Sequence, residues 1–213
     1  MTWCIILLAG KNTRFSKIHG KKINELINKK PMFMHVLDTC KKCNFLDKII
    51  IVINKKHKNT FINSELYDVV IGSEKNRQDS INICLNKIKK NVKKDDVVVT
   101  LDGDRPFVSA SLIKKVVNVA KKYNAASAIV PLHDSIIKIK NTCNYIDRKY
   151  LFAVQTPQAF KFKMWKKTKS NQGTDFFSSI GFNLKKENFV IGELENFKIT
   201  TKTDLKFAKK LII

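Results

Sequence analysis

Short apolar runs alternate with segments of helical period along most of the chain. Five runs have the length and composition of buried strands, at residues 3–9, 48–53, 67–71, 97–101 and 125–130. Apolar residues recur at helical spacing between them, at residues 32–43, 54–62, 79–88 and 109–122, where Ser109 is a suitable N-cap. This order predicts an α/β fold of three layers, with a doubly wound, mainly parallel sheet between helices. Such sheets bind ligands outside the carboxyl ends of their strands.

The segment 132–150 breaks this alternation. Residues 133–140 and 144–150 have the pattern of two strands, and residues 141–143 form the turn between them. A lone hairpin has no core of its own and needs another surface to pack on. We therefore expect a protruding β-hairpin arm that reaches a neighbouring subunit.

The chain then returns to the core. The pattern predicts helices near residues 161–169 and 174–181, strands at 189–191 and 197–200, and a terminal helix at 202–211. There is no internal repeat and no low-complexity linker, and 213 residues suit one domain. We expect a single domain over residues 1–213, with residues 132–150 as its dimerisation arm.

Other features of the chain bear on its location. The apolar runs are too short to cross a bilayer, and the N-terminus MTWCIILLAGK lacks the basic start and cleavage site of a signal peptide. Five cysteines, an odd number, argue against a disulfide framework, and the lone Cys40–Cys43 pair lacks further zinc ligands. We expect a soluble cytoplasmic protein without a membrane partner, or an organelle stromal one if a transit peptide was removed.

The net charge is strongly positive. The chain carries 41 Lys and Arg against 18 Asp and Glu, a formal charge of +23, which first suggests nucleic acid. However, the lysines are spread along the polar positions of amphipathic segments, which favours a solvated surface and no nucleic-acid partner. Residues 160–167 interleave lysines with aromatic residues, and a helix with Phe162 and Trp165 facing inward explains them as well as a nucleic-acid patch does.

Only four of the 41 basic residues are arginine: Arg14, Arg77, Arg105 and Arg148. Arginine offers a planar fork that grips phosphate or carboxylate with two hydrogen bonds, which lysine cannot copy. The surroundings of these four positions are therefore candidate functional sites.

Three of these arginines lie in polar segments next to predicted strands or helices. The segment LLAGKNTRF (7–15) follows the first strand and resembles a phosphate-binding turn, although its one glycine makes the signal weak. The segment LDGDRP (101–106) ends a strand, and Asp102 or Asp104 there suits Mg²⁺ bound to nucleotide phosphates. The segment NRQDS (76–80) opens a helix, whose N–H groups can face a ligand.

Together these segments resemble a known family. LAGKNTRF (8–15), GSEKNRQDS (72–80), DGDRPFVS (102–109), QTPQAF (155–160) and NFKITTKTDL (196–205) are similar to motifs of the cytidylyltransferases that activate polyol phosphates with CTP. The closest members act on 2-C-methyl-D-erythritol 4-phosphate, and relatives act on ribitol 5-phosphate. The resemblance implies a fold of the nucleotide-diphospho-sugar transferase type, a homodimer formed through the arm, and Mg²⁺ as cofactor.

The resemblance also implies roles for individual residues. The catalytic cations would be Arg14, Lys21 and Lys198, with Lys22 as the alternative to Lys21. The nucleotide would be bound by Ala9, Gly10, Gly72, Glu74, Arg77, Ser80 and Gly103, with Arg77 holding the loop. Asp102 would bind the metal, and Arg105 would brace its turn. The polyol phosphate would be bound by Ser135, Arg148, Thr156 and Thr174, the first two from the other subunit.

Two of the departures from the family pattern bear directly on nucleotide and metal binding. The first loop has one glycine, Gly10, where the family usually has two, and Asp104 replaces an alanine. The added carboxylate of Asp104 could bind metal or repel nucleotide.

The acceptor has two candidates. Residues 134–138 and 148–158 look like the methylerythritol branch, and residues 95–100 and 192–194 look like the ribitol branch. We favour methylerythritol phosphate, because the first set contributes to the substrate pocket. Two other classes are a glycosyltransferase that uses Asp102 and Asp104 as a metal-binding DxD motif, and a nucleic-acid-binding protein.

Overall fold

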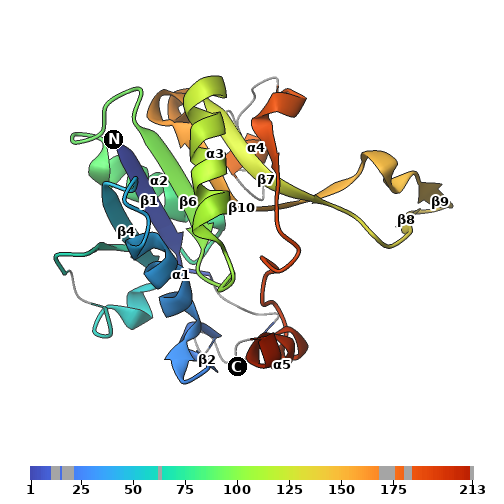
Figure 1. Ribbon diagram of the computed structural model, residues 1–213, viewed down its shortest axis with the longest axis horizontal. Helices are drawn as coiled ribbons and strands as arrows, with labels where there is room; N and C mark the ends of the chain where they lie inside the picture. Colours follow the sequence, from blue (N-terminus) through green and yellow to red (C-terminus); the bar gives the residue numbers. More distant parts are fainter. Residues whose placement is uncertain (11–14, 16–21, 62–63, 168–175, 180–183, 212–213) are drawn as a thin grey trace.

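The computed structural model describes residues 1–10, 15, 22–61, 64–167, 176–179 and 184–211. A seven-stranded sheet in the order β11-β7-β10-β6-β1-β4-β5 forms its centre (Figure 1). Its strands are β1 (Thr2–Leu7), β4 (Lys48–Ile53), β5 (Asp68–Ile71), β6 (Val97–Asp102), β7 (Ala125–Pro131), β10 (Phe152–Lys161) and β11 (Phe189–Ile191).

The neighbouring strands are mostly parallel. β1 pairs in parallel with β4 and β6, β4 with β5, and β7 with β11, whereas β10 runs antiparallel to both β6 and β7. The prediction of a mainly parallel α/β sheet is confirmed. The carboxyl ends of β1 and β6 lie side by side, because Leu7 pairs with Asp102.

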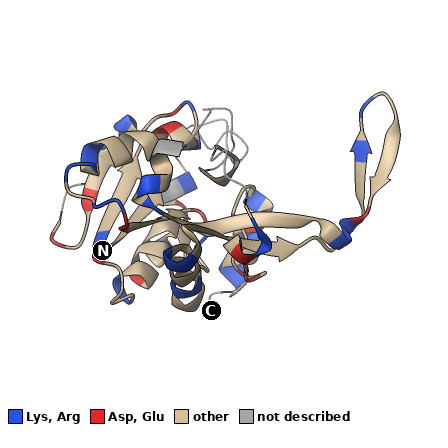
Figure 2. Cartoon of the chain, turned by 90° about the horizontal axis from the view of Figure 1, so that it is seen from above, with Lys and Arg blue, Asp and Glu red and all other residues tan. Residues whose placement is uncertain are grey.

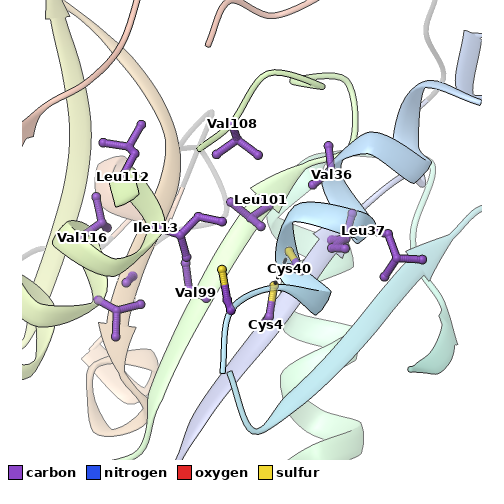
Figure 3. Packing of buried hydrophobic residues seen from close by; sticks show 14 of the residues in the cluster. Cys4, Val36, Leu37, Cys40, Val99, Leu101, Val108, Leu112, Ile113 and Val116 are labelled. Atoms are coloured by element: carbon purple, nitrogen blue, oxygen red, sulfur yellow. Dashed lines mark hydrogen bonds between the residues drawn. The ribbon is translucent and has the colours of Figure 1, made fainter. Parts of the chain in front are cut away.

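Helices cover both faces of the sheet. The helices are α1 (Met32–Lys41), α2 (Arg77–Ile88), α3 (Ala110–Tyr123), α4 (Phe176–Ser179) and α5 (Lys202–Leu211). Side chains alternate along β1, so that Cys4 and Ile6 face α1 and α3, and Trp3 and Ile5 face α2. Figure 3 shows the first of these two cores, where Leu37 and Ile113 pack toward β1 and β6. The three predicted layers are therefore confirmed.

Several predicted bounds agree with the structure. The strands at residues 48–53 and 189–191 and the helix at residues 202–211 match β4, β11 and α5. Ser109 is the N-cap of α3, and its hydroxyl accepts a hydrogen bond from the backbone N–H of Leu112 at 3.0 Å. This bond satisfies one of the free N–H groups at the start of the helix.

The sequence pattern missed β10, a central strand of ten residues. Pro157 lies in its middle among Gln155, Thr156 and Gln158, and a polar run with a proline argues against a central strand. The structure accommodates the proline because the pairing with β7 shifts register between Gln155 and Gln158.

Four other predictions are wrong in type or extent. In its described residues, 54–61, the predicted helix at 54–62 has a 3₁₀ turn, η2 (Lys55–His57), as its one helical element. The described part of the predicted helix near 161–169 is the 3₁₀ segment η4 (Phe162–Lys167). The predicted strand at 197–200 is irregular, because Ile199 N–H donates to the Asp104 carbonyl and not to a strand. The second strand of the arm ends early, since Arg148–Tyr150 form a 3₁₀ turn, η3.

The predicted arm is present as a hairpin. Its strands β8 (Ile136–Ile139) and β9 (Cys143–Ile146) pair only with each other, and the hairpin projects from the body on the ends of β7 and β10 (Figures 1 and 2). Ile139 is 69% exposed and Tyr145 is 81% exposed. The hairpin is thus too thin to bury its own apolar side chains.

The five cysteines are free thiols in the structure. Cys4, Cys40, Cys43 and Cys84 are buried, and Cys143 is exposed on the arm. Burial raises the pKa of Cys84 to about 12, which keeps this thiol protonated and unreactive at neutral pH. None of the helices in the described part of the chain is long and apolar enough to cross a membrane.

Candidate active site

A pocket of about 370 Å³ opens at the carboxyl ends of β1 and β6, the edge where the fold predicts a ligand. It is lined by eight of the predicted site residues: Ala9, Gly10, Glu74, Arg77, Ser80, Asp102, Gly103 and Lys198. Lys22, the alternative to Lys21, and Asp104 also line it. The tertiary structure thus brings together segments from both ends of the chain.

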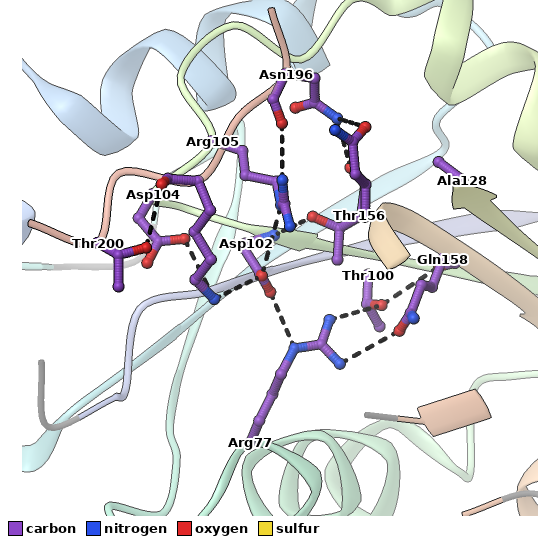
Figure 4. A network of polar contacts seen from close by, with 12 residues as sticks. Arg77, Thr100, Asp102, Asp104, Arg105, Ala128, Thr156, Gln158, Asn196 and Thr200 are labelled. Carbon is purple, nitrogen blue, oxygen red and sulfur yellow. Dashed lines mark hydrogen bonds and ion pairs between the residues drawn. The ribbon is translucent and has the colours of Figure 1, made fainter. Parts of the chain in front are cut away.

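Asp102, the last residue of β6, lies at the centre of a cluster of cations (Figure 4). Its Oδ1 lies 2.9 Å from Arg77 Nε, and its Oδ2 lies 2.9 Å from Lys198 Nζ and 3.8 Å from Arg105 Nε. Burial alone would raise the pKa of Asp102, but these three charges outweigh it and hold the pKa well below its ordinary value. Asp102 is therefore a carboxylate at neutral pH.

Lys198 is the cation of the cluster that lines the pocket from the C-terminal segment. Burial would lower its pKa, but the neighbouring carboxylates of Asp102 and Asp104 raise it above its ordinary value. The side chain is therefore an ammonium group at the pocket, where one of its three hydrogen-bond donors is taken by Asp102.

Asp104 forms a second ion pair at the same rim. Its Oδ2 lies 2.5 Å from Lys22 Nζ, and its Oδ1 lies 3.6 Å from Lys198 Nζ. Lys22 begins a short 3₁₀ turn, η1 (Lys22–Asn24), and its side chain is only 4% exposed. Lys22 therefore brings a buried ammonium group to the pocket, whereas Lys21 lies outside the described residues.

The loop before α2 forms another wall of the pocket. The Ser80 hydroxyl donates to the Ser73 carbonyl at 2.8 Å and accepts from the Ser73 N–H at 3.0 Å. A Cβ on Gly72 would lie 2.6 Å from Val52 Cγ1, so a side chain there would push the loop away from the sheet. The predicted residues Gly72 and Ser80 thus hold the backbone of this loop close to Ala9.

The resemblance implies that Arg77 helps to hold this loop, and its guanidinium forms an ion pair with Asp102 on the sheet. Its guanidinium points toward the sheet, where it also lies 3.4 Å from Gln158 Oε1 and from Thr100 Oγ1 (Figure 4). The residue therefore fixes the orientation of the Asp102 carboxylate from the first turn of α2.

A buried amide, Asn196, was given no role by the sequence pattern. Its Nδ2 donates to Gln155 Oε1 at 3.1 Å and to the Thr156 carbonyl at 2.8 Å. Its backbone carbonyl accepts from Arg105 Nη1 at 2.7 Å. It therefore joins β10, the turn after β6 and the segment that carries Lys198. Asn196 stands in the quoted motif NFKITTKTDL, but spacing alone does not indicate these contacts.

Thr156 lies behind the pocket wall. It is 4% exposed, and its hydroxyl accepts from the backbone N–H of Asp102 at 3.1 Å. In this chain its observed contact supports the end of β6. Gly103 follows Asp102 and lines the pocket, and a Cβ there would overlap the Leu8 side chain.

The remaining predicted residues are not assembled at the pocket. Ser135 and Arg148 are exposed on the arm, where Arg148 Nη1 donates to the His133 carbonyl. Arg14, Lys21 and Thr174 lie outside the described residues.

The donor set at Asp102 fits a magnesium ion that arrives with a nucleotide. Within the described ranges, no three His, Cys, Asp or Glu side chains gather into a cage for a metal. Mg²⁺ usually takes only one or two carboxylates and fills its other positions with phosphate oxygens and water. Asp102 is ionised and lines the pocket, and each of its oxygens keeps a lone pair beyond those used by Arg77 and Lys198.

Comparisons with known proteins show the family to which the chain is similar. A family model described as 2-C-methyl-D-erythritol 4-phosphate cytidylyltransferase (IspD) matches residues 2–213. The chain is 33% identical over 229 residues to the 2-C-methyl-D-erythritol 4-phosphate cytidylyltransferase of Clostridium acetobutylicum, with 100% of this chain and 97% of that protein covered. It is 32% identical over 212 residues to the bifunctional enzyme IspD/IspF of Pelagibacter ubique, with 97% of this chain and 57% of that longer protein covered.

A solved structure supports the same assignment. The 4-diphosphocytidyl-2C-methyl-D-erythritol synthase of Anaerococcus prevotii superposes with a TM-score of 0.79 at 26% identity, with 99% of this chain and 95% of that chain covered. The full-length match, the shared fold and the pocket of lysines and carboxylates lead to one conclusion. This chain belongs to the 2-C-methyl-D-erythritol 4-phosphate cytidylyltransferase family.

Proposed function

We propose that the chain transfers the cytidylyl group of CTP to 2-C-methyl-D-erythritol 4-phosphate and releases diphosphate, a step in the synthesis of isoprenoid precursors. The observation that carries the proposal is the convergence of Lys22, Lys198 and the Asp102 cluster on one pocket at the ends of β1 and β6. Family membership and the printed names of the relatives support the choice of donor and acceptor.

The residues in the pocket suit this reaction. A phosphate oxygen of the acceptor forms a bond to the α-phosphorus of CTP, and the bond from that phosphorus to the bridging oxygen of diphosphate breaks. The acceptor monoester is already ionised near neutral pH, so no strong base is needed. The protein has to neutralise and align two anions. Lys22 and Lys198 supply ammonium groups for this, and Arg14, outside the described residues, is proposed to supply a third cation.

We propose Mg²⁺ as the cofactor, held by Asp102. When bound, the ion would neutralise phosphate charge and bring nucleotide oxygens into a fixed arrangement. Arg77 and Arg105 orient Asp102 from two sides, so the carboxylate is preorganised before a nucleotide enters.

The other predicted roles complete the proposal. The backbone around Ala9, Gly10, Gly72 and Gly103, with Glu74 and Ser80, would bind the nucleotide, because these residues line or support the pocket wall. The acceptor phosphate would contact Ser135 and Arg148 of the partner subunit, together with Thr174 and the Thr156 segment. This requires a homodimer, for which the exposed apolar arm is the support. A cytoplasmic location is proposed from the free thiols.

A diphosphate-release assay of the purified chain tests the proposal. We expect turnover with CTP, Mg²⁺ and methylerythritol phosphate, and at least about 100-fold lower kcat/KM with ATP, GTP or UTP, because hydrogen-bonding sites reject wrong partners by such factors. A reaction without acceptor controls for hydrolysis of CTP. Faster turnover with ribitol 5-phosphate would instead assign the ribitol branch, and no diphosphate with either acceptor would contradict the proposal.

A further inference from the structure

The carboxylate of Asp104 is the feature of the pocket that the proposed reaction does not yet use. It departs from the alanine of the family pattern and adds a negative charge to a site for anions. Its Oδ2 lies 2.5 Å from Lys22 Nζ, and its Oδ1 lies 3.6 Å from Lys198 Nζ. One carboxylate thus spans two lysines that are far apart in the sequence and line the same pocket.

We propose that Asp104 is a positioning residue for the cytidylyl transfer: it holds the ammonium group of Lys22 in its reactive place at the cost of some affinity for CTP. This inference rests on the proposed function. From the sequence, two roles were open for Asp104, metal binding and repulsion of nucleotide, and the inference adds the positioning of Lys22.

The burial of Lys22 is the first argument. Its side chain is 4% exposed, and a buried ammonium group needs a partner that compensates for its lost hydration. Among the described residues, Asp104 is the one carboxylate that lies within 4 Å of Lys22 Nζ. Lys22 therefore depends on Asp104 for its place in the pocket.

The rigidity of Asp104 is the second argument. Its carbonyl accepts a hydrogen bond from Ile199 N–H at 2.9 Å, and the next residue, Arg105, closes a turn onto the Asp102 carbonyl at 3.1 Å. Lys22 lies instead on the three-residue turn η1. The held backbone of Asp104 therefore keeps its carboxylate next to the Lys22 ammonium group.

The charge balance gives the third argument and the signature of the role. Asp104 reduces the net positive charge that faces the phosphates, so its removal should strengthen ground-state binding of CTP. It should also release Lys22 from the position required in the transition state. A loss in kcat without a rise in KM marks an interaction that acts in the transition state.

The test compares Asp104→Asn and Asp104→Ala with the wild type, with CTP varied at saturating methylerythritol phosphate. Asp38→Asn is the matched control. Asp38 Oδ2 forms an ion pair with Lys30 Nζ at 2.7 Å, and neither residue lines the pocket. We expect kcat to fall about 10- to 100-fold in both Asp104 variants. We expect KM for CTP to fall, calorimetry to show tighter CTP binding, and the control to match the wild type.

A double variant separates positioning from other roles. If Asp104 acts through Lys22, then Lys22→Met with Asp104→Asn should have the same kcat as Lys22→Met alone, within about twofold. Additive losses, a raised KM with normal kcat, or a higher Mg²⁺ requirement with normal kcat at saturation would each overturn the inference. Circular dichroism and thermal melting report folding, and the near-isosteric Asp104→Asn decides if Asp104→Ala does not fold. Absence of turnover in the wild type would contradict the proposed function itself, whereas wild-type turnover with unaffected Asp104 variants would contradict only this inference.

Discussion

At the scale of single residues, the site is a balance between two carboxylates and the cations around them. Asp102 contacts Arg77, Lys198 and Arg105, and Asp104 contacts Lys22 and Lys198. A site for two phosphorylated substrates needs excess positive charge, but lysine and arginine side chains repel one another without an anion between them. The two carboxylates reduce the repulsion between the cations and hold their side chains at the pocket before substrate binds.

Asp102 makes the stability of the protein depend on pH in a predictable direction. Its pKa in the folded protein is held below the ordinary value of about 4, so its contribution is complete above that pH and declines as the pH falls toward the lowered pKa. We expect Asp102→Asn to lower the free energy of unfolding by about 3 kcal/mol at pH 7. The difference should stay constant from pH 5 to 8 and shrink by about 1.4 kcal/mol per pH unit below pH 4.

Urea unfolding of both proteins between pH 3 and 8 measures this difference. Asp95→Asn is the control, because Asp95 pairs with Lys163 at 2.8 Å on the exposed surface and should leave stability unchanged. A difference between wild type and Asp102→Asn that is the same at pH 3 as at pH 7 would show that the charge of Asp102 is not its source.

At the scale of elements, the segment that follows β11 ties the sheet to the active site. It leaves the edge strand, passes the buried amide of Asn196, places Lys198 in the pocket and enters α5. The backbone of this segment is hydrogen-bonded to the turn after β6, through Ile199 N–H and the Asp104 carbonyl. The side-chain amide of Asn196 is hydrogen-bonded to the bulge of β10. These contacts explain why residues 197–200 are not a strand although their side chains have a strand-like pattern.

We expect Asn196→Ala to disturb both stability and turnover. The variant leaves the buried Gln155 Oε1 and the Thr156 carbonyl without the Asn196 Nδ2 donor, which should lower the free energy of unfolding by about 2 kcal/mol. Because Lys198 lies two residues further along the chain, kcat should also fall, by about tenfold. Urea unfolding and diphosphate release measure the two effects.

Asn86→Ala is the matched control for this variant. Asn86 also donates from Nδ2 to a backbone carbonyl, that of Asn82 at 3.1 Å, but it is exposed on α2. It should change neither stability nor kcat. Normal turnover in Asn196→Ala would show that Lys198 is positioned without this amide.

At the scale of the whole molecule, the arm and the charge have different explanations. The arm projects from the body, and the proposed contribution of Arg148 to the acceptor site would come from the arm of a second subunit. Figure 2 shows Lys and Arg on helices, loops and the arm alike, with Asp and Glu between them. This distribution fits a solvated basic surface and gives no support to a nucleic-acid-binding face.

Mixing two inactive variants tests the shared site. Lys198→Ala removes a cation of the body, and Arg148→Ala removes a cation of the arm, so each homodimer should have two defective sites. A mixed dimer would combine one intact body with one intact arm. After random exchange of subunits, about a quarter of wild-type activity should return. Light scattering should give twice the chain mass of 24.5 kDa, and absence of recovered activity in confirmed mixed dimers would contradict sharing.

The order of elements and much of the site follow from the sequence alone. The runs at β1, β4 and β6 and the helical periods of α1, α2 and α3 determine a layered α/β fold, since the spacing of apolar residues reflects which face is buried. A parallel sheet then brings Ala9 and Asp102 to one edge. The sequence also predicted the N-cap at Ser109, and the few arginines among many lysines indicated candidate functional positions.

The tertiary structure alone decided how the charges are paired. The sequence pattern did not predict β10 because Pro157 argues against a central strand. Only the pairing with the neighbouring strand shows that a bulge accommodates this proline. The contacts of Lys22 with Asp104 and of Asn196 with β10 join residues 82 and about 40 positions apart, and no local pattern encodes them. Composition and period determine which surfaces are buried, whereas the partner of each buried polar group depends on where the folded chain returns.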